Sequence, residues 1–195
     1  MPVTDKDFIT VVSGLPRSGT SMMMRMLDQG GMPTITDGFR QADEDNPLGY
    51  YEFEPVKRLG KDDSWLPDAY NKVVKIIYIF LYKLPPEHRY KVIFMMRNLD
   101  EVVASQKTML RRRQEGDRLS DDQLVSSFDE QLQQLDLWIR KQPNFTVLYV
   151  NYEVVIRDPA EASRDIAQFL GLPLDTEAMT RSVEPALHRN RSVEG

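Results

Sequence analysis

The chain has 195 residues (22.6 kDa), of which 41% are hydrophobic and 28% charged, a composition typical of one globular domain with a substantial core. It contains no cysteine, which excludes thiolate catalysis, iron–sulfur clusters and cysteine-based zinc sites, and its two histidines, His88 and His188, are too far apart in the sequence to suggest a metal site. The net charge of −5 argues against broad nucleic-acid binding, so an anionic ligand would depend on locally placed cations.

Short runs rich in β-branched residues predict three buried strands, at residues 8–13, 90–96 and 145–150. Amphipathic patterns predict helices over about 19–29, after residue 97, from 121 onward and over 159–170. The last two helices begin at typical capping pairs, Ser120 with Gln123 and Asp158 with Glu161.

The segments between these elements are less regular. Residues 33–50 form a polar stretch with loop residues and little periodicity. Residues 52–61 are compatible with a helix, and residues 71–79 with a strand that continues as a helix. Because strands alternate with amphipathic helices, the sequence predicts an α/β fold of three layers, a mostly parallel sheet with helices on both faces, in a single domain over residues 1–195.

The start of the chain lacks a charged segment followed by a long apolar run, so no signal peptide is expected. The most apolar later run, Val73 to Tyr82, is about half as long as the roughly 20 residues that span a bilayer, and it contains Lys75. These features predict a cytoplasmic protein without membrane or nucleic-acid partners.

The segment Gly14 to Ser21, GLPRSGTS, stands between a predicted strand and a predicted helix. A glycine-rich loop in that position directs backbone N–H groups and the positive end of the helix at one place, which suits a phosphate group. Its spacing matches the Walker A pattern, but Thr20 occupies the lysine position, and the nearby cation is Arg17. We therefore expect a P-loop NTPase-like fold with a phosphate site at this loop.

The PRSGTS sequence resembles the 5′-phosphosulfate loop of sulfotransferases that use 3′-phosphoadenosine 5′-phosphosulfate (PAPS), in the arginine form typical of tyrosylprotein and other Golgi enzymes. The resemblance implies that PAPS is the co-substrate. It also implies that five consecutive residues hold the 5′-phosphosulfate: Arg17, Ser18, Gly19, Thr20 and Ser21.

Two later segments resemble the same family. In VIFMMRNLDEVVAS, Arg97 ends a strand and Ser105 follows eight residues later, as in the family's pair for the 3′-phosphate. Residues 147–173 are similar to the family's strand, Tyr-Glu pair and helix ending in Phe-Leu-Gly, which would place Tyr152 against the nucleotide; a packing role for this ring is the alternative. The three segments occur in the family's order.

Sulfuryl transfer requires in-line positioning, stabilisation of charge on the leaving phosphate, and a base for the acceptor. Arg17 is predicted to stabilise that charge, and Lys75 resembles the family's lysine near the active centre, with a snorkelling lysine as the alternative. The histidine base of cytosolic members has no counterpart in residues 75–84, whereas glycan and tyrosyl members use a glutamate. Glu52 and Glu54 are therefore the candidate bases, each of which would otherwise be a solvated carboxylate, and no metal is required.

The Lys-Gly-x-x-Gly segment that closes over the nucleotide in cytosolic members is absent. Residues 185–191 instead carry cations, either close to the cofactor or in a frayed terminus. The sequence thus predicts a PAPS-dependent sulfotransferase acting on a hydroxyl or amine of a small-molecule, glycan or peptide acceptor. Two alternatives are a P-loop small-molecule kinase, against which the absent Walker lysine counts, and a non-catalytic nucleotide-binding module.

Overall fold

The computed structural model describes residues 7–39, 42–43, 46, 49–112 and 119–184. Its strands are β1 (Ile9–Gly14), β2 (Thr34–Ile35), β3 (Val73–Lys75), β4 (Tyr90–Met96) and β5 (Phe145–Asn151). Its α-helices are α1 (Thr20–Gln29), α2 (Leu99–Arg112), α3 (Asp121–Ile139), α4 (Tyr152–Arg157), α5 (Pro159–Leu170) and α6 (Thr176–Arg181). Short 3₁₀ helices are η1 (Glu54–Arg58), η2 (Leu66–Ala69) and η3 (Tyr78–Lys83). The predicted cation-bearing segment at 185–191 lies outside the described residues.

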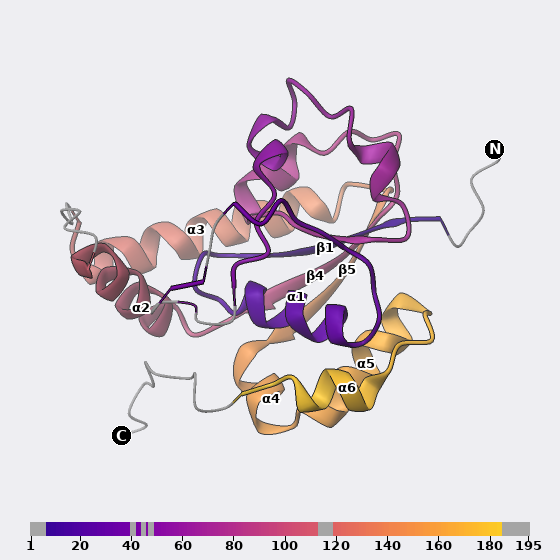
Figure 1. Cartoon of the computed structure of the whole chain (residues 1–195). Coiled ribbons are helices and arrows are strands. Elements are labelled where there is room, and N and C mark those ends of the chain that lie inside the picture. Colours follow the sequence, from indigo (N-terminus) through magenta and orange to yellow (C-terminus); the bar gives the residue numbers. More distant parts are fainter. Residues whose placement is uncertain (1–6, 40–41, 44–45, 47–48, 113–118, 185–195) are drawn as a thin grey trace.

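The five strands form one sheet in the order β2-β3-β1-β4-β5, and every neighbouring pair is parallel. Helices cover both faces of this sheet, as Figure 1 shows. One apolar core lies between the sheet and α2, α3 and the 3₁₀ helices, and the other lies between the sheet and α1, α4, α5 and α6. The prediction of a three-layer α/β fold with a parallel sheet is confirmed.

Successive side chains of the central strands point to opposite faces of the sheet, which explains why the sequences of these strands are continuous apolar runs. In β1, Ile9 and Val11 pack into the first core while Val12 packs into the second. In β4, Phe94 and Met95 divide in the same way. Because both faces of a central parallel strand are buried, nearly every position must be apolar.

Several local predictions are confirmed at the level of single contacts. The capping box of α3 is present, since the Ser120 side chain accepts from the Gln123 N–H and the Gln123 side chain accepts from the Ser120 N–H. Asp158 caps α5 by accepting from the Glu161 N–H at 2.9 Å. Such side-chain caps satisfy helix N–H groups that have no partner within the helix.

The irregular segments differ from prediction in detail. The predicted loop at 33–50 contains the two-residue strand β2, and only Glu54–Arg58 of the segment 52–61 is helical, as η1. The segment 71–79 does switch from strand to helix, but its helical part is the 3₁₀ helix η3. Strands and helices this short carry too few residues for a recognisable hydrophobic period, so long-range pairing decides them.

The carboxyl ends of all strands lie at one edge of the sheet, because the strands are parallel. Adjacent strands are in register there, with Val12 opposite Lys75 and Gly14 opposite Met95. After β1 the chain passes through α1 to the β2–β3 side, and after β4 it passes through α2 and α3 to β5. In open α/β proteins, ligands bind at the carboxyl edge of the sheet, next to the strand where the connections change direction.

Within the described part of the chain, no helix is both long enough and apolar enough to cross a membrane.

Candidate active site

The loop between β1 and α1 closes on itself around Ser18. This residue is 1% exposed, and its hydroxyl donates to the Leu15 carbonyl at 2.8 Å. Gly19 follows with φ +97°, and a Cβ at this position would lie 2.5 Å from Cδ2 of the Tyr152 ring, so the approach of the loop to Tyr152 requires glycine. The closed loop brings the amino end of α1, with first-turn N–H groups that have no intrahelical partner, to the carboxyl edge of the sheet.

Thr20 and Ser21 open α1 directly after this loop. Thr20, at the Walker lysine position, is 8% exposed. The Ser21 hydroxyl donates to the Tyr50 carbonyl at 3.3 Å, so the first turn of the helix is tied to the segment that precedes η1.

Arg17 connects the loop to two later parts of the chain. Its φ of +74° is unfavourable for a residue other than glycine. Its carbonyl accepts from Nη1 of Arg97 at 3.1 Å, and its own Nε donates to Oγ of Ser105 at 2.9 Å. The structure therefore brings the predicted loop cation and the predicted arginine–serine pair into one hydrogen-bonded group.

Arg97 is held by two further groups. Its Nε donates to Oε2 of Glu101 at 2.9 Å, and the side chains of this ion pair are only 7% and 4% exposed. Its guanidinium carbon lies 4.5 Å from the centre of the Tyr152 ring, within the range of a cation–π contact. Tyr152 is both a core residue and a neighbour of Arg97, so the packing and site interpretations of its ring are compatible.

Glu101 is a site residue that the sequence analysis did not identify. The sequence does contain a sign of this ion pair, because Arg97 and Glu101 have opposite charges and are four residues apart across the start of α2. That spacing is common on solvated helix faces, however, and only the fold buries both groups.

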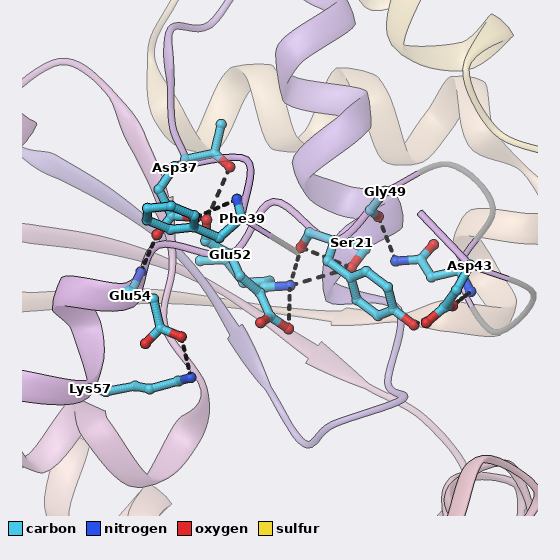
Figure 2. Close-up of polar contacts among 12 residues, drawn as sticks. Ser21, Asp37, Phe39, Asp43, Gly49, Glu52, Glu54 and Lys57 are labelled. Carbon is cyan, nitrogen blue, oxygen red and sulfur yellow. Dashed lines mark hydrogen bonds and ion pairs between the residues drawn. The ribbon is translucent and has the colours of Figure 1, made fainter. Parts of the chain in front are cut away.

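Lys75 is at the centre of a second group of polar contacts at the carboxyl edge of the sheet. Its side chain is 8% exposed, and its ammonium group donates to the Tyr50 carbonyl and lies 3.5 Å from Oγ of Ser21 and 3.9 Å from Oε1 of Glu52. Figure 2 shows Ser21 and Glu52 turned toward this group from α1 and from the segment before η1. The Tyr50 hydroxyl donates to Asp43 at 2.6 Å, which anchors the same segment from its other side. Lys75 thus joins the amino end of α1 to a carboxylate that is 32% exposed.

Glu54 has different partners. Its carboxylate accepts from Nζ of Lys57 at 2.6 Å, and both side chains are more than half exposed. Its N–H donates to Oδ2 of Asp37 at 2.5 Å. Of the two candidate bases, the structure brings Glu52 to Lys75 and places the carboxylate of Glu54 with a solvated lysine (Figure 2).

Two other titratable groups can be placed relative to this edge. His88 lies two residues before the first residue of β4 and therefore at the opposite edge from Arg97, with Nδ1 2.9 Å from the Tyr70 hydroxyl. The Tyr51 hydroxyl donates to Asp28 at 3.1 Å; burial, followed by the Asp28 charge, raises the pKa of Tyr51 to about 12. Tyr51 is therefore protonated at neutral pH.

A cavity of about 580 Å³ lies between α3 and the carboxyl half of β4. Its walls include Leu15, Phe94 and Leu132, and it reaches Ser18 and Arg97 at the loop.

Across the residues that the structure places, no three His, Asp or Glu side chains gather in a way that could hold a metal ion.

Comparison with protein families gives a match over nearly the whole chain, because residues 6–191 fit the family model described as sulfotransferase domain. The chain belongs to the sulfotransferase family. It is accordingly an enzyme of sulfuryl transfer, and its parallel sheet with helices around it has the P-loop NTPase-like fold of sulfotransferases.

Solved structures agree on the fold of this sulfotransferase. The sulfotransferase domain of the olefin synthase from Synechococcus PCC 7002 has 16% sequence identity and a TM-score of 0.59, with 100% of this chain and 92% of that chain covered. Mouse sulfotransferase SULT7A1, solved with PAP, has 16% identity and a TM-score of 0.61, covering 98% of this chain and 69% of that chain. Retinol dehydratase, solved with androsterone and the inactive cofactor PAP, has 20% identity and a TM-score of 0.54, covering 93% and 64%. A search of curated proteins found no match.

Proposed function

We propose that this sulfotransferase uses PAPS as its sulfuryl donor and transfers the group to a hydroxyl or amine of an acceptor, with Glu52 as the general base. The observation that carries the proposal is the position of Lys75, which links the amino end of α1 to the Glu52 carboxylate. This contact supports a base next to the proposed donor site. The similar structures of mouse SULT7A1 and retinol dehydratase were both solved with PAP, which supports the choice of donor.

The residues at the carboxyl edge fit a nucleotide with phosphate groups at its 3′ and 5′ positions. The net charge of the protein is −5, but two of its cations, Arg17 and Arg97, are hydrogen-bonded to each other next to the amino end of α1. Positive charge is therefore concentrated at the place where an anion would bind. In the proposal the 5′-phosphosulfate is held by the loop residues: Arg17, Ser18, Gly19, Thr20 and Ser21. Arg97 and Ser105 hold the 3′-phosphate, and Tyr152 lies against the nucleotide.

When bound, PAPS supplies a sulfuryl group with the 5′-phosphate as leaving group. Glu52 accepts the proton of the acceptor hydroxyl or amine as that atom forms its bond to sulfur. Arg17 and Lys75 place positive charge where the bridging oxygen gains negative charge, and this interaction is stronger in the transition state than in the ground state. These steps use the residues of this chain and require no metal.

The donor assignment is tested by thermal unfolding with adenosine 3′,5′-bisphosphate in the absence of Mg²⁺. At a concentration one hundred times Kd we expect stabilisation of ~2.7 kcal/mol, because arginines of the protein supply the positive charge. A shift that requires Mg²⁺, or a larger shift with Mg²⁺ and ATP, would refute the donor assignment.

The base assignment is tested with Glu52→Gln, which keeps the shape of the side chain but removes its basicity. Turnover with labelled PAPS and a panel of small-molecule, glycan and peptide acceptors should fall by roughly 10²–10⁴, while bisphosphate affinity stays near that of the wild type. Glu54→Gln is the matched control, because the Glu54 carboxylate pairs with Lys57. Full turnover in Glu52→Gln would refute the assignment of Glu52 as the base.

A further inference from the structure

Glu52 lies in a segment, residues 49–53, that forms neither helix nor strand. A base in such a segment has no regular backbone to hold its carboxylate in place. A displacement of about 1 Å at a reacting group can reduce a rate by about 10²-fold, so a base here requires another support. The contacts of Asp37 supply one.

Asp37 binds the backbone on both sides of Phe53. Its N–H donates to the Glu52 carbonyl at 3.2 Å, and its Oδ2 accepts from the Glu54 N–H at 2.5 Å. The hydroxyl of the preceding residue, Thr36, also donates to the Glu52 carbonyl, at 3.0 Å. These three bonds fix both peptide units that follow Glu52, and Figure 2 shows Asp37 between the backbones of Phe39 and Glu54.

Asp37 is itself fixed relative to Lys75. It lies two residues after the last residue of β2, and β2 pairs with β3 through Ile35 opposite Val74, the residue before Lys75. Its Oδ1 accepts from the Phe39 N–H at 3.0 Å, which orients the carboxylate. The cation and the base are therefore held by neighbouring strands of the same sheet.

We propose that Asp37 is a positioning residue, which holds Glu52 beside Lys75, where it can accept the proton of the acceptor. This inference rests on the proposed role of Glu52 as the base. The hydrogen bonds of Asp37 join it to the backbone of Glu52, Glu54 and Phe39, so it acts through Glu52.

The test measures kcat, KM for PAPS and bisphosphate affinity for Asp37→Asn, alone and combined with Glu52→Gln. The asparagine keeps one acceptor oxygen but presents an NH₂ group to one of the two backbone N–H donors, so the support is weakened without loss of side-chain volume. We expect kcat to fall about 10- to 100-fold with KM and bisphosphate affinity unchanged. In the Glu52→Gln background, Asp37→Asn should cause no further fall, because the base through which it acts is already absent.

Asp62→Asn is the matched control. Asp62 makes the same type of contact in the loop between η1 and η2, where its Oδ1 accepts from the Ser64 N–H at 3.3 Å and the Ser64 hydroxyl at 2.7 Å. This variant should retain the wild-type kcat. If Asp37→Asn proves too unstable to assay, Thr36→Val is the second variant. It removes the second bond to the Glu52 carbonyl, together with the long bond from the Gly38 N–H to the Thr36 hydroxyl at 3.4 Å. It should also lower kcat, with no effect in the Glu52→Gln background.

The outcomes separate the two hypotheses. An unchanged kcat in Asp37→Asn, together with an inactive Glu52→Gln, overturns the positioning role and leaves the base in place. An equal loss of kcat in both backgrounds also overturns it, since Asp37 would then act on the fold in general. Full activity of Glu52→Gln refutes the base, and the positioning role with it.

Discussion

Glu101 provides the sharpest test of how this edge of the sheet is built. Its carboxylate and the Arg97 guanidinium are 2.9 Å apart, and the two side chains are 4% and 7% exposed. Glu101→Ala would leave the guanidinium buried without this carboxylate. Removing one partner of a buried ion pair costs about 3–5 kcal/mol, a large share of the ~5–15 kcal/mol that stabilises a typical domain. We expect the free energy of unfolding to fall by about that amount.

Replacing both partners distinguishes the contribution of this ion pair to stability from the contribution of Arg97 to ligand binding. An apolar pair of similar volume, Arg97→Met with Glu101→Leu, needs no charge compensation, and such exchanges are often neutral or stabilising. The double variant should therefore recover most of the stability that Glu101→Ala loses. It should still bind adenosine 3′,5′-bisphosphate at least about tenfold more weakly, because each charge-assisted bond to the 3′-phosphate contributes about 1.5–3 kcal/mol.

Urea unfolding followed by circular dichroism measures the stability of the three proteins, and titration calorimetry measures their affinities. Adenosine 5′-phosphosulfate, which lacks the 3′-phosphate, is the control ligand and should lose far less affinity in the double variant. Wild-type stability in Glu101→Ala would show that burial of the pair contributes little. Equal losses for the two ligands, or undiminished binding of the bisphosphate, would refute the assignment of Arg97 to the 3′-phosphate.

Three further predictions concern single residues. Gly19→Ala should lower the free energy of unfolding by about 1–3 kcal/mol in urea and weaken bisphosphate binding, because φ is +97° and the added Cβ would meet the Tyr152 ring; a neutral substitution would contradict the close approach. His88→Ala should leave turnover near wild type, since His88 lies at the opposite edge of the sheet, and an inactive variant would restore the histidine mechanism. Tyr51→Phe should leave the pH profile of turnover unchanged below about pH 10, because burial and Asp28 raise the pKa of Tyr51 to about 12 and keep it protonated; loss of an ionisation in that range would count against this placement.

The main strands and the longer helices could be predicted from sequence because their patterns are local. β4 was predicted over Tyr90–Met96 and has those bounds, since a strand buried on both faces is an unbroken apolar run. The start of α3 directly after Ser120 follows from a capping box contained within four residues. The loop between β1 and α1 could be predicted for the same reason, because a glycine between a strand and a helix is visible in adjacent residues, and Gly19 has a positive φ in the structure.

Other features depend on contacts between distant residues. Glu52 and Glu54 are two positions apart and chemically alike, and no local pattern distinguishes them. The distinction comes from β2 pairing with β3, which places Asp37 against their backbone and directs Glu52 toward Lys75. Whether the Arg97–Glu101 spacing marks a solvated pair or a buried one depends in the same way on what packs over α2. The sequence by itself determined which residue types were present to bind an anion and on which elements they lie; the tertiary structure decided which of them meet, because contacts across 80 residues arise only when the strands assemble.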